Sequence, residues 1–372
     1  MRVIICGLTD NIDSITSRIN SLHEIVGYTD IKKYLKRYNC FNGIKYDYIS
    51  NFKEYDALVI SYSSNIDIDL AFTEFSSIKS KVVVYQWFKN ATICDPVSGY
   101  LNSDLSFSQI ILGMSHSQND IQTHLMDKNT FKFSFPSMDL FCHNQIIKKI
   151  SNSNKTTGIE TAIIELPYYI FNYDLSKSKR SIKNRLFYFK QFGDYHHYGA
   201  NDSESHVIQQ FDTYLNLFYH CAPLCALNNS ELKKENSYLS WLIKGIYHQI
   251  SVFRENARIW ESEYQETREE NENILKQLVE CLYQINSKMK IYVVVCPFNP
   301  LFRLLHMRKI KKEKKYFYDV VEKMQVKIID DFKWTNNPFL FLDHCHLTTK
   351  GSYKYTNYLN NKLVNIDYSK GR

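Results

Sequence analysis

A serine and an Asp-x-x-His pair are the residues of this sequence best suited to chemistry. Ser115 follows a short apolar run ending at Gly113, and Asp343 and His346 stand three residues apart near the C-terminus. In a helical turn this spacing puts both side chains on one face, so the carboxylate can hold one imidazole nitrogen and leave the other available. A Ser–His–Asp site needs this arrangement, because the histidine takes the serine proton and the aspartate stabilises the imidazolium.

Each of these features also has a simpler interpretation. A serine after a strand is usually a turn former or a helix cap. Asp343 and His346 could belong to a capped loop, and His344 and Cys345 between them keep a metal site open. Because no second ligand cluster accompanies them, the sequence predicts neither a metal nor another cofactor.

The apolar runs predict two parallel sheets that would position these residues. We expect strands over 2–7, 24–29, 57–61 and 81–86 in the first series, and over 108–113, 131–135, 161–166, 291–296 and 326–331 in the second. Near-continuous apolar strands are typical of sheets covered by helices on both faces. Ligands bind beyond the carboxyl ends of such strands, where Ser115 would lie.

The sequence predicts an α/β fold with two domains. Residues 1–103 are expected to form a Rossmann-like domain. Residues 104–372 are expected to form a three-layer α/β/α domain with a helical insertion at about 230–288, where Trp241, Ile246 and Ile250 recur at roughly helical spacing. The first turn has Gly7 but lacks the other glycines of a dinucleotide fingerprint, so we expect no nucleotide cofactor there.

Two stretches, 111–118 and 342–351, resemble the first and last blocks of the SGNH (GDSL-like) hydrolase superfamily. The resemblance implies a flavodoxin-like second domain with Ser115 as nucleophile, Asp343 as orienting residue and His346 as base. The stretches 133–140 and 165–176 look like a divergent branch of that superfamily, which is associated with bacterial surface-polysaccharide and teichoic-acid biosynthesis loci.

The sequence departs from the family pattern at three places. Met114 stands where an Asp usually precedes the nucleophile, Ser137 stands where the second block has Gly, and the G-x-N-D block is missing. Asn172 is the candidate for a side-chain oxyanion donor, with the Ser137 backbone N–H as an alternative. His116, next to the nucleophile, is a candidate substrate contact.

These observations favour a serine esterase or an O-acyltransferase. We expect it to act on a cell-surface polysaccharide or its precursor through an acyl-serine intermediate, with a carbohydrate or an acylated small molecule as substrate. One alternative is a catalytically impaired binding or assembly protein that keeps the fold. Another is a nucleotide-dependent sugar-modifying transferase that uses the Rossmann-like domain.

Composition limits the choice of partner and compartment. The net charge is +7, and the one dense basic run, 308–315, is interpreted as a solvated helix face. Nothing resembles a nucleic-acid-reading motif, while a negatively charged membrane surface stays open as a partner. The nine cysteines form no C-x-x-C pair, and no long apolar segment occurs, so the sequence predicts a cytoplasmic protein. The oligomeric state stays open.

Overall fold

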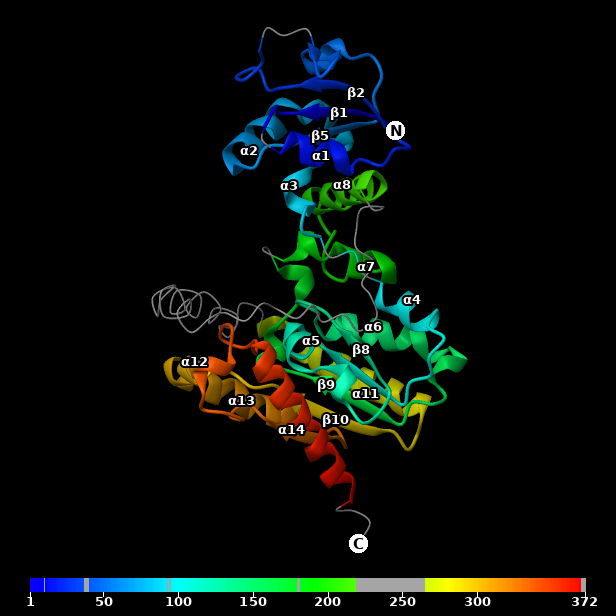
Figure 1. Cartoon of the computed structure of the whole chain (residues 1–372), viewed down its shortest axis with the longest axis vertical. Coiled ribbons are helices and arrows are strands. Elements are labelled where there is room, and N and C mark those ends of the chain that lie inside the picture. Colours follow the sequence, from blue (N-terminus) through cyan, green and yellow to red (C-terminus); the bar gives the residue numbers. More distant parts are fainter. Residues whose placement is uncertain are drawn as a thin grey trace. The chain divides into compact units, whose positions relative to one another are not determined.

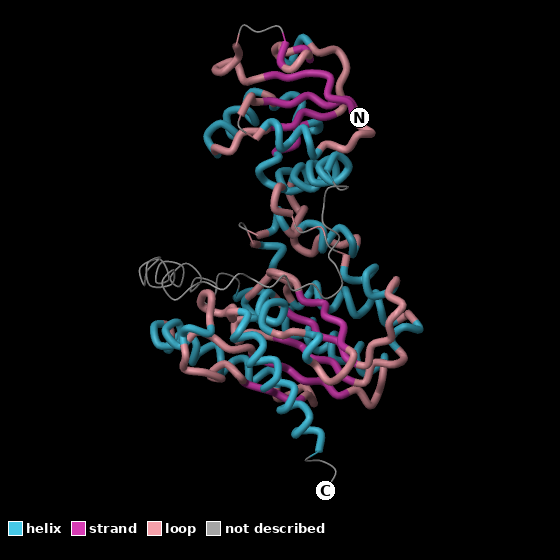
Figure 2. Tube along the Cα trace, viewed as in Figure 1, coloured by secondary structure: helices cyan, strands magenta, loops and turns pink. Residues whose placement is uncertain are grey.

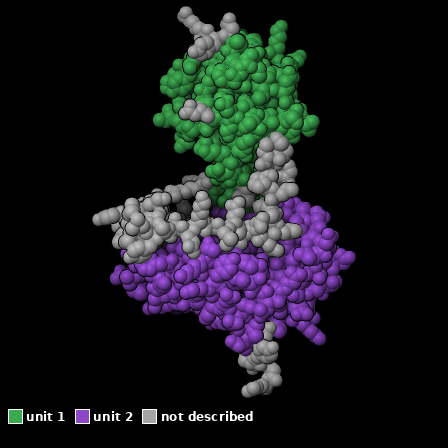
Figure 3. All heavy atoms as spheres, viewed as in Figure 1, with its two compact units in different colours: residues 1–94, 176–224 green, residues 95–175, 225–372 purple. Residues whose placement is uncertain are grey.

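A computed structural model describes residues 1–9, 11–36, 40–91, 93, 95–178, 181–218 and 265–368. The protein is α/β, with two parallel sheets (Figures 1 and 2) and one short antiparallel pair of strands. It divides into two compact units (Figure 3). Unit 1 comprises residues 1–94 and 176–224, and unit 2 comprises residues 95–175 and 225–372. The predicted fold class is confirmed.

Unit 1 is built on a four-stranded parallel sheet in the order β2-β1-β5-β6. Its strands are β1 (Arg2–Cys6), β2 (Glu24–Thr29), β5 (Ala57–Ile60) and β6 (Val82–Val84). All four fall within the predicted runs. Short elements complete this part: α1 (Ile12–Arg18), β3 (Cys40–Phe41), β4 (Ile44–Lys45), α2 (Asn65–Glu74) and α3 (Tyr85–Phe88).

The segment after residue 176 returns to unit 1, which differs from the predicted division. Helices α7 (Leu186–Phe192) and α8 (Asp202–Phe218) lie there. The reason is aromatic packing: the ring of Phe88 contacts that of Phe211, and Tyr85 contacts Phe218, each pair with centroids 5.4 Å apart.

The predicted boundary at residues 103 and 104 also differs, because α4 (Pro96–Leu101) belongs to unit 2. Tyr100 of this helix is buried, and its ring packs on Phe107, Phe131 and Phe133 at centroid distances of 5.1 to 5.8 Å. These aromatic contacts tie α4 to the second sheet.

Unit 2 holds a five-stranded parallel sheet in the order β8-β7-β9-β10-β11. Its strands are β7 (Gln109–Gly113), β8 (Thr130–Ser134), β9 (Thr161–Glu165), β10 (Lys290–Val295) and β11 (Lys327–Asp330). Numbered within the unit, the order is 2-1-3-4-5, that of flavodoxin-like folds. All five predicted strands of the second series are present.

Helices cover both faces of this sheet. Right-handed crossovers place the helices that precede β9, β10 and β11 on one face and the helix between β7 and β8 on the other. The first group is α6 (Leu140–Ser151), α11 (Arg268–Ile285), α12 (Pro300–Leu305) and α13 (Met307–Val321). The opposite face carries α5 (Ser115–Asp120) and α14 (Thr349–Tyr368), which contact each other.

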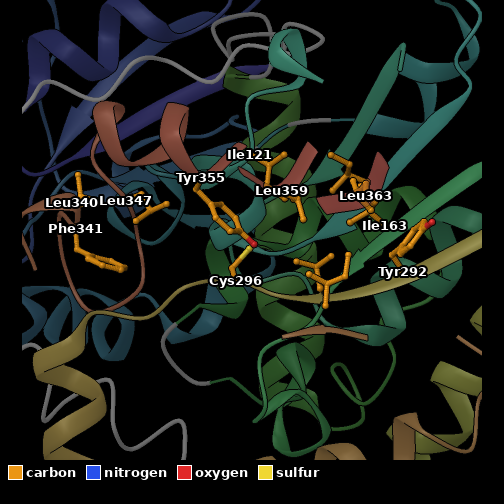
Figure 4. Packing of buried hydrophobic residues seen from close by; sticks show 13 residues of the cluster. Ile121, Ile163, Tyr292, Cys296, Leu340, Phe341, Leu347, Tyr355, Leu359 and Leu363 are labelled. Carbon is orange, nitrogen blue, oxygen red and sulfur yellow. The ribbon is translucent and has the colours of Figure 1, made fainter. Parts of the chain in front are cut away.

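Three side chains of α14, spaced four residues apart in the sequence, reach the core beneath this helix. Tyr355, Leu359 and Leu363 are buried among apolar side chains of the sheet (Figure 4). They meet Ile163 of β9 and Tyr292 of β10. This packing fixes the helix that follows the Asp-x-x-His segment.

Helix α11 lies in the last part of the predicted helical insertion. The earlier part of that insertion, including Trp241, Ile246 and Ile250, lies outside the described residues. Within the described ranges, no helix combines the length and apolar character needed to cross a membrane.

Candidate active site

The turn after β7 positions Ser115. The strand ends at Gly113, Met114 stays extended, and Ser115 is the first residue of α5, so its N–H has no acceptor within the helix. A Cβ at Gly113 would lie only 2.1 Å from Ser117 Oγ and 2.9 Å from Glu165 Oε2. The turn therefore requires glycine, which explains why the apolar run ends there.

The Asp-x-x-His segment forms a tight loop in which Asp343 holds the backbone. Its Oδ1 accepts hydrogen bonds from the N–H groups of Cys345 (2.9 Å) and His346 (2.8 Å). The N–H of Leu342 donates to the carbonyl of His346 at 2.8 Å and closes the loop. Its short, closed backbone fixes the direction of both catalytic candidates.

Ser115, His346 and Asp343 meet as a hydrogen-bonded triad. Ser115 Oγ lies 2.9 Å from His346 Nε2, and His346 Nδ1 lies 2.6 Å from Asp343 Oδ2. The carboxylate fixes the tautomer, because Nδ1–H must donate to it, which leaves Nε2 to accept from the serine hydroxyl. Burial opposes ionisation of Asp343, but the electrostatic interaction and hydrogen bond with His346 outweigh it and lower the pKa of this carboxyl.

Ser115 and His346 are 231 positions apart in the sequence. They meet because α5 is hydrogen-bonded both to the loop that carries His346 and to α14. Asp120, at the end of α5, accepts from the N–H of Leu347 at 2.8 Å. Thr356 of α14 donates to the Asp120 carbonyl at 3.2 Å and accepts from the N–H of Gln122 at 2.9 Å. These contacts fix the turn that carries Ser115 relative to the loop that carries His346.

Glu165 is a functional candidate that sequence reasoning missed. It ends β9, is fully buried, and accepts from the Met114 N–H (2.9 Å) with one oxygen and from His116 Nδ1 (3.0 Å) with the other. Burial opposes its charge, yet the interactions with His116 and the Met114 N–H lower its pKa. Glu165 therefore holds the residues on both sides of Ser115. Its signal was a carboxylate closing an otherwise apolar strand.

His116, predicted as a candidate substrate contact, is buried next to Ser115 in the chain. It is 2% exposed, its ring centroid is 5.7 Å from that of His346, and its Nδ1 faces Glu165. A side chain buried in this way has little surface to offer a ligand. We infer instead that His116 helps to hold the turn that carries Ser115, through its contact with Glu165.

His143 of α6 supports the same turn from the other face of the sheet and was also missed by sequence reasoning. Its Nε2 lies 3.2 Å from the carbonyl of Gly113, to which it donates as a neutral ring. Burial lowers the pKa of His143 to about 4, so the ring stays neutral at physiological pH.

Ser137, the predicted replacement for a family glycine, has a left-handed backbone with φ of 65°. Only glycine adopts this conformation without steric cost. It follows β8, the neighbour of β7, so it lies at the same carboxyl edge of the sheet as Ser115. Ser137 thus adopts the left-handed backbone that would be expected of a glycine at this position.

Asn172, predicted as an oxyanion donor, is not brought to the triad. Its Nδ2 donates to Glu313 Oε2 at 2.8 Å, and its Oδ1 accepts from Arg268 Nε. Glu313 is 2% exposed, and a buried carboxylate needs such partners. The prediction for Asn172 is therefore corrected: the amide serves a buried ion-pair cluster between α11 and α13.

The segment after β10 contacts the loop that carries Asp343 and His346. Asn299 donates from Nδ2 to the carbonyl of Asp343 at 3.2 Å and from its N–H to that of His344 at 2.9 Å. The ring of Phe298 packs on His116 with centroids 5.3 Å apart. Asn299 and Phe298 position the site without offering a reactive group.

The metal interpretation can be compared with this geometry. Ligand atoms of His116, Cys345 and His346 lie within 4.8 Å of one another, as do those of Asp343, His344 and Cys345. However, both nitrogens of His346 already have partners in the triad, and His116 Nδ1 faces Glu165. Burial also raises the pKa of the Cys345 thiol, which disfavours the thiolate that binds metals. These residues fit a hydrogen-bonded triad better than a metal centre.

Comparison with known proteins finds no matching family model and no matching curated protein. Among solved structures, the chain is similar to one assigned as a platelet activating factor from Streptococcus pneumonia, with 10% identity and a TM-score of 0.39. That similarity covers 81% of this chain and all of the other. It is also similar to the periplasmic domain of a lipopolysaccharide acetyltransferase from Salmonella ser. Paratyphi A, with 9% identity and a TM-score of 0.33, covering 82% and 99% of the two chains. Likenesses at this level do not establish an activity.

Proposed function

We propose that this protein is a serine esterase or O-acyltransferase that works through an acyl-Ser115 intermediate. The observation that carries the proposal is the continuous hydrogen-bonded chain from Ser115 Oγ through His346 to Asp343. Such a chain activates a hydroxyl that is otherwise a weak nucleophile.

The first half-reaction acylates the serine. His346 Nε2 takes the proton as Ser115 Oγ bonds to the ester carbonyl carbon, and Asp343 stabilises the imidazolium that forms. The carbon–oxygen bond to the leaving group then breaks, and His346 returns the proton to that oxygen. In the second half-reaction His346 takes a proton from water or a sugar hydroxyl as that oxygen bonds to the acyl carbon. The bond from this carbon to Ser115 Oγ then breaks, and His346 returns the proton to Ser115 Oγ. Water gives an esterase and a sugar gives a transferase.

Two backbone N–H groups are the best candidates for stabilising the oxyanion. The Ser115 N–H is free of helix bonding, and Ser137 holds its left-handed backbone at the same sheet edge. With Asn172 bound elsewhere, no side-chain donor of the family type is assigned among the described residues. One missing donor costs about 3 kcal/mol of transition-state stabilisation, so we expect a slow enzyme.

The proposed substrate is an acylated cell-surface polysaccharide or its precursor. It is supported by the resemblance of segments 133–140 and 165–176 to a branch associated with polysaccharide loci. The triad itself supports only the ester chemistry, because the same acyl-serine serves many acyl groups and acceptors.

Hydrolysis of p-nitrophenyl acetate and butyrate tests the chemistry. The wild-type protein should release nitrophenol, and Ser115→Ala should not. Ser151→Ala is the matched control, because Ser151 lies at the end of α6 and its hydroxyl bonds only to the Lys148 carbonyl among the described residues. Equal hydrolysis by wild type and Ser115→Ala would remove the proposal. Adding monosaccharide acceptors and measuring acylated sugar by mass spectrometry separates transfer from hydrolysis.

A second candidate is a binding protein of a polysaccharide locus that keeps the fold without turnover. The observation in its favour is the commitment of Asn172 to Glu313, which leaves the oxyanion donors incomplete. If the protein only binds, the Ser115→Ala and His346→Ala variants should keep the biological phenotype. If it is an enzyme, both variants should lose it.

The environment of Asp30 in unit 1 argues against the alternative of a nucleotide-dependent transferase. Asp30, at the end of β2, is 3% exposed; it accepts from the Tyr62 hydroxyl and, at 3.5 Å, from the N–H of Leu8. A carboxylate engaged in this way is poorly placed to bind a ribose. Thermal-shift measurements with nucleotides should therefore show no stabilisation.

A further inference from the structure

Helices α12 and α13 adjoin one another after β10 (Figure 1), and each carries an unusual surface. The first is apolar and exposed. Leu304, Leu305 and Met307 are 69%, 55% and 62% exposed, and Leu301 is 38% exposed. Leu301, Leu304 and Leu305 stand three and four residues apart, on one face of α12. We call these four residues the apolar ridge.

The same helix has a separate buried anchor. Phe302 is fully buried, and its ring packs on Phe298 and His344 with centroids 5.8 and 5.2 Å away. Phe302 anchors α12 on the protein, whereas Leu304, Leu305 and Met307 turn more than half of their surface outward. Several large apolar side chains in one exposed cluster are unusual on a soluble surface and mark an interaction site.

The second surface is basic. Arg308, Lys311, Lys312 and Lys315 follow an i, i+3, i+4, i+7 spacing, which puts them on one face of α13. All four are exposed, opposite the buried Ile310, and among the described residues none has an ion-pair partner. We call these four residues the basic face. Asp319 and Glu322 stand further along, at the C-terminal end of the helix.

Helix stability does not explain the basic face. Cations in the first turns oppose the helix macrodipole, and the first turn of α13 has no acidic residue to offset them. Arg308 and Lys312, like Lys311 and Lys315, are like charges four residues apart, which also disfavours the helix. A basic cluster that weakens its own helix is best explained by an anionic ligand.

We propose that the apolar ridge and the basic face together dock the protein on an anionic phospholipid surface. Exposed leucines would enter the headgroup boundary while the lysines and arginine meet lipid phosphates, the pairing used by interfacial helices. Charge complementarity favours lipid over a second copy of this chain, because two basic faces would repel each other. A nucleic acid would match the charge but not the leucines.

The docking surface adjoins the proposed active site without being part of it. Asn299 caps α12 through its Oδ1 and also bonds the Asp343 carbonyl. Docking through α12 would therefore bring the base loop near the lipid surface, where a lipid-linked substrate could reach it. The docking inference does not depend on catalysis and is tested separately from it.

Vesicle co-sedimentation of the full chain tests the proposal. Wild type should bind phosphatidylglycerol-rich vesicles and not phosphatidylcholine vesicles. Each basic residue contributes about 1 kcal/mol at an anionic surface, so the Arg308→Gln/Lys311→Gln/Lys312→Gln variant should bind roughly 100-fold more weakly. The Leu304→Ser/Leu305→Ser/Met307→Ser variant should also lose at least about 10-fold.

The matched control removes the same charge elsewhere. Lys53, Lys79 and Lys89 are exposed in unit 1, so Lys53→Gln/Lys79→Gln/Lys89→Gln should bind like wild type. Thermal melts of every variant establish that it is folded. Failure of wild type to bind anionic vesicles overturns the proposal, as does equal loss in the control. Tighter binding to duplex DNA than to vesicles, or a dimer abolished by the leucine changes, would identify another occupant and also overturn it.

Discussion

The two parallel sheets begin with the same strand order, 2-1-3-4 when strands are numbered within each sheet, yet their carboxyl edges differ in chemistry. In unit 1 the polar groups at this edge bond to one another: Ser61 Oγ donates to the Gly7 carbonyl at 2.5 Å, and the Tyr62 hydroxyl donates to Asp30. In unit 2 a chain of hydrogen bonds runs from Asp343 through His346 and ends on the Ser115 hydroxyl. The edge of unit 1 is closed by its own side chains, whereas that of unit 2 ends in a group able to react.

Space at the first turn explains much of this difference. A Cβ at Gly7 would lie 2.8 Å from Ser61 Oγ and from the Tyr62 ring, so side chains fill the position that a phosphate would need. At Gly113 the crowding comes from Ser117 and Glu165, which lie beneath the turn and support it. A shared fold therefore does not determine chemistry, which depends on the side chains at each strand end.

The largest effect is expected from substitutions that break the hydrogen-bonded chain of Ser115, His346 and Asp343 in unit 2. Ser115→Ala and His346→Ala should each lower kcat for ester hydrolysis by at least about 10⁴-fold, and the double variant should be no worse, because the two groups act as one unit. Steady-state kinetics on p-nitrophenyl acetate measure this. Additive losses would mean that the pair does not act together.

The next effect concerns the support beneath the turn. Glu165→Gln removes the charge that faces His116 and should cost roughly 3 kcal/mol of unfolding free energy. Misplacing Ser115 should also lower kcat on the order of 100-fold with little change in KM. Urea titration and kinetics measure both. The control is Glu160→Gln, at a largely exposed glutamate five residues earlier, which should change neither.

The pH dependence of stability tests His143. Its pKa is about 4 when folded, against about 6.5 in a free histidine, so protonation favours the unfolded state. Its contribution is complete above pH 6.5 and is lost as pH falls from 6.5 to 4, up to about 3 kcal/mol. His143→Gln should flatten this part of the stability profile relative to wild type. His124→Gln, at an exposed histidine, should leave the slope unchanged.

A smaller effect tests the closed edge of unit 1. Tyr62→Phe removes the hydroxyl that bonds Asp30 and should cost about 1 to 3 kcal/mol of stability. Ester hydrolysis should stay at the wild-type level, because Tyr62 lies in unit 1. A loss of kcat in folded Tyr62→Phe protein would contradict the separation of a structural edge from a reactive one.

The smallest effect sharpens the assignment of Ser137. Ser137→Gly relieves the left-handed backbone and should change stability by less than about 1 kcal/mol while keeping activity. Ser137→Val cannot hold this backbone easily and should lose both stability and activity. Thermal melts and kinetics on the pair distinguish a backbone role from a hydroxyl role.

Patterns along the chain were enough to predict the sheets and to bring Ser115, Asp343 and His346 together. Apolar runs identify parallel strands, and the carboxyl ends of such strands share one edge. Whether the three residues catalyse stays a prediction. Glu165 and His143 were missed because their partners, the Met114 N–H and the Gly113 carbonyl, are backbone groups that become near neighbours only after folding.

Asn172 and the domain boundaries show the limit of sequence patterns. Asn172 was chosen to stand in for the asparagine of the missing G-x-N-D block, but Arg268 and Glu313, far along the chain, bind its amide. The return of α8 to unit 1 depends on rings such as Phe211 that pair with Phe88, and no local pattern specifies such a pairing.

Reaction with a fluorophosphonate probe, mapped by tandem mass spectrometry, tests the triad most directly. Folded wild-type protein should carry a single adduct on Ser115, and His346→Ala should carry almost none while keeping its melting temperature. An unlabelled Ser115 in folded wild-type protein, or equal labelling in His346→Ala, would contradict an activated serine at this edge of the sheet.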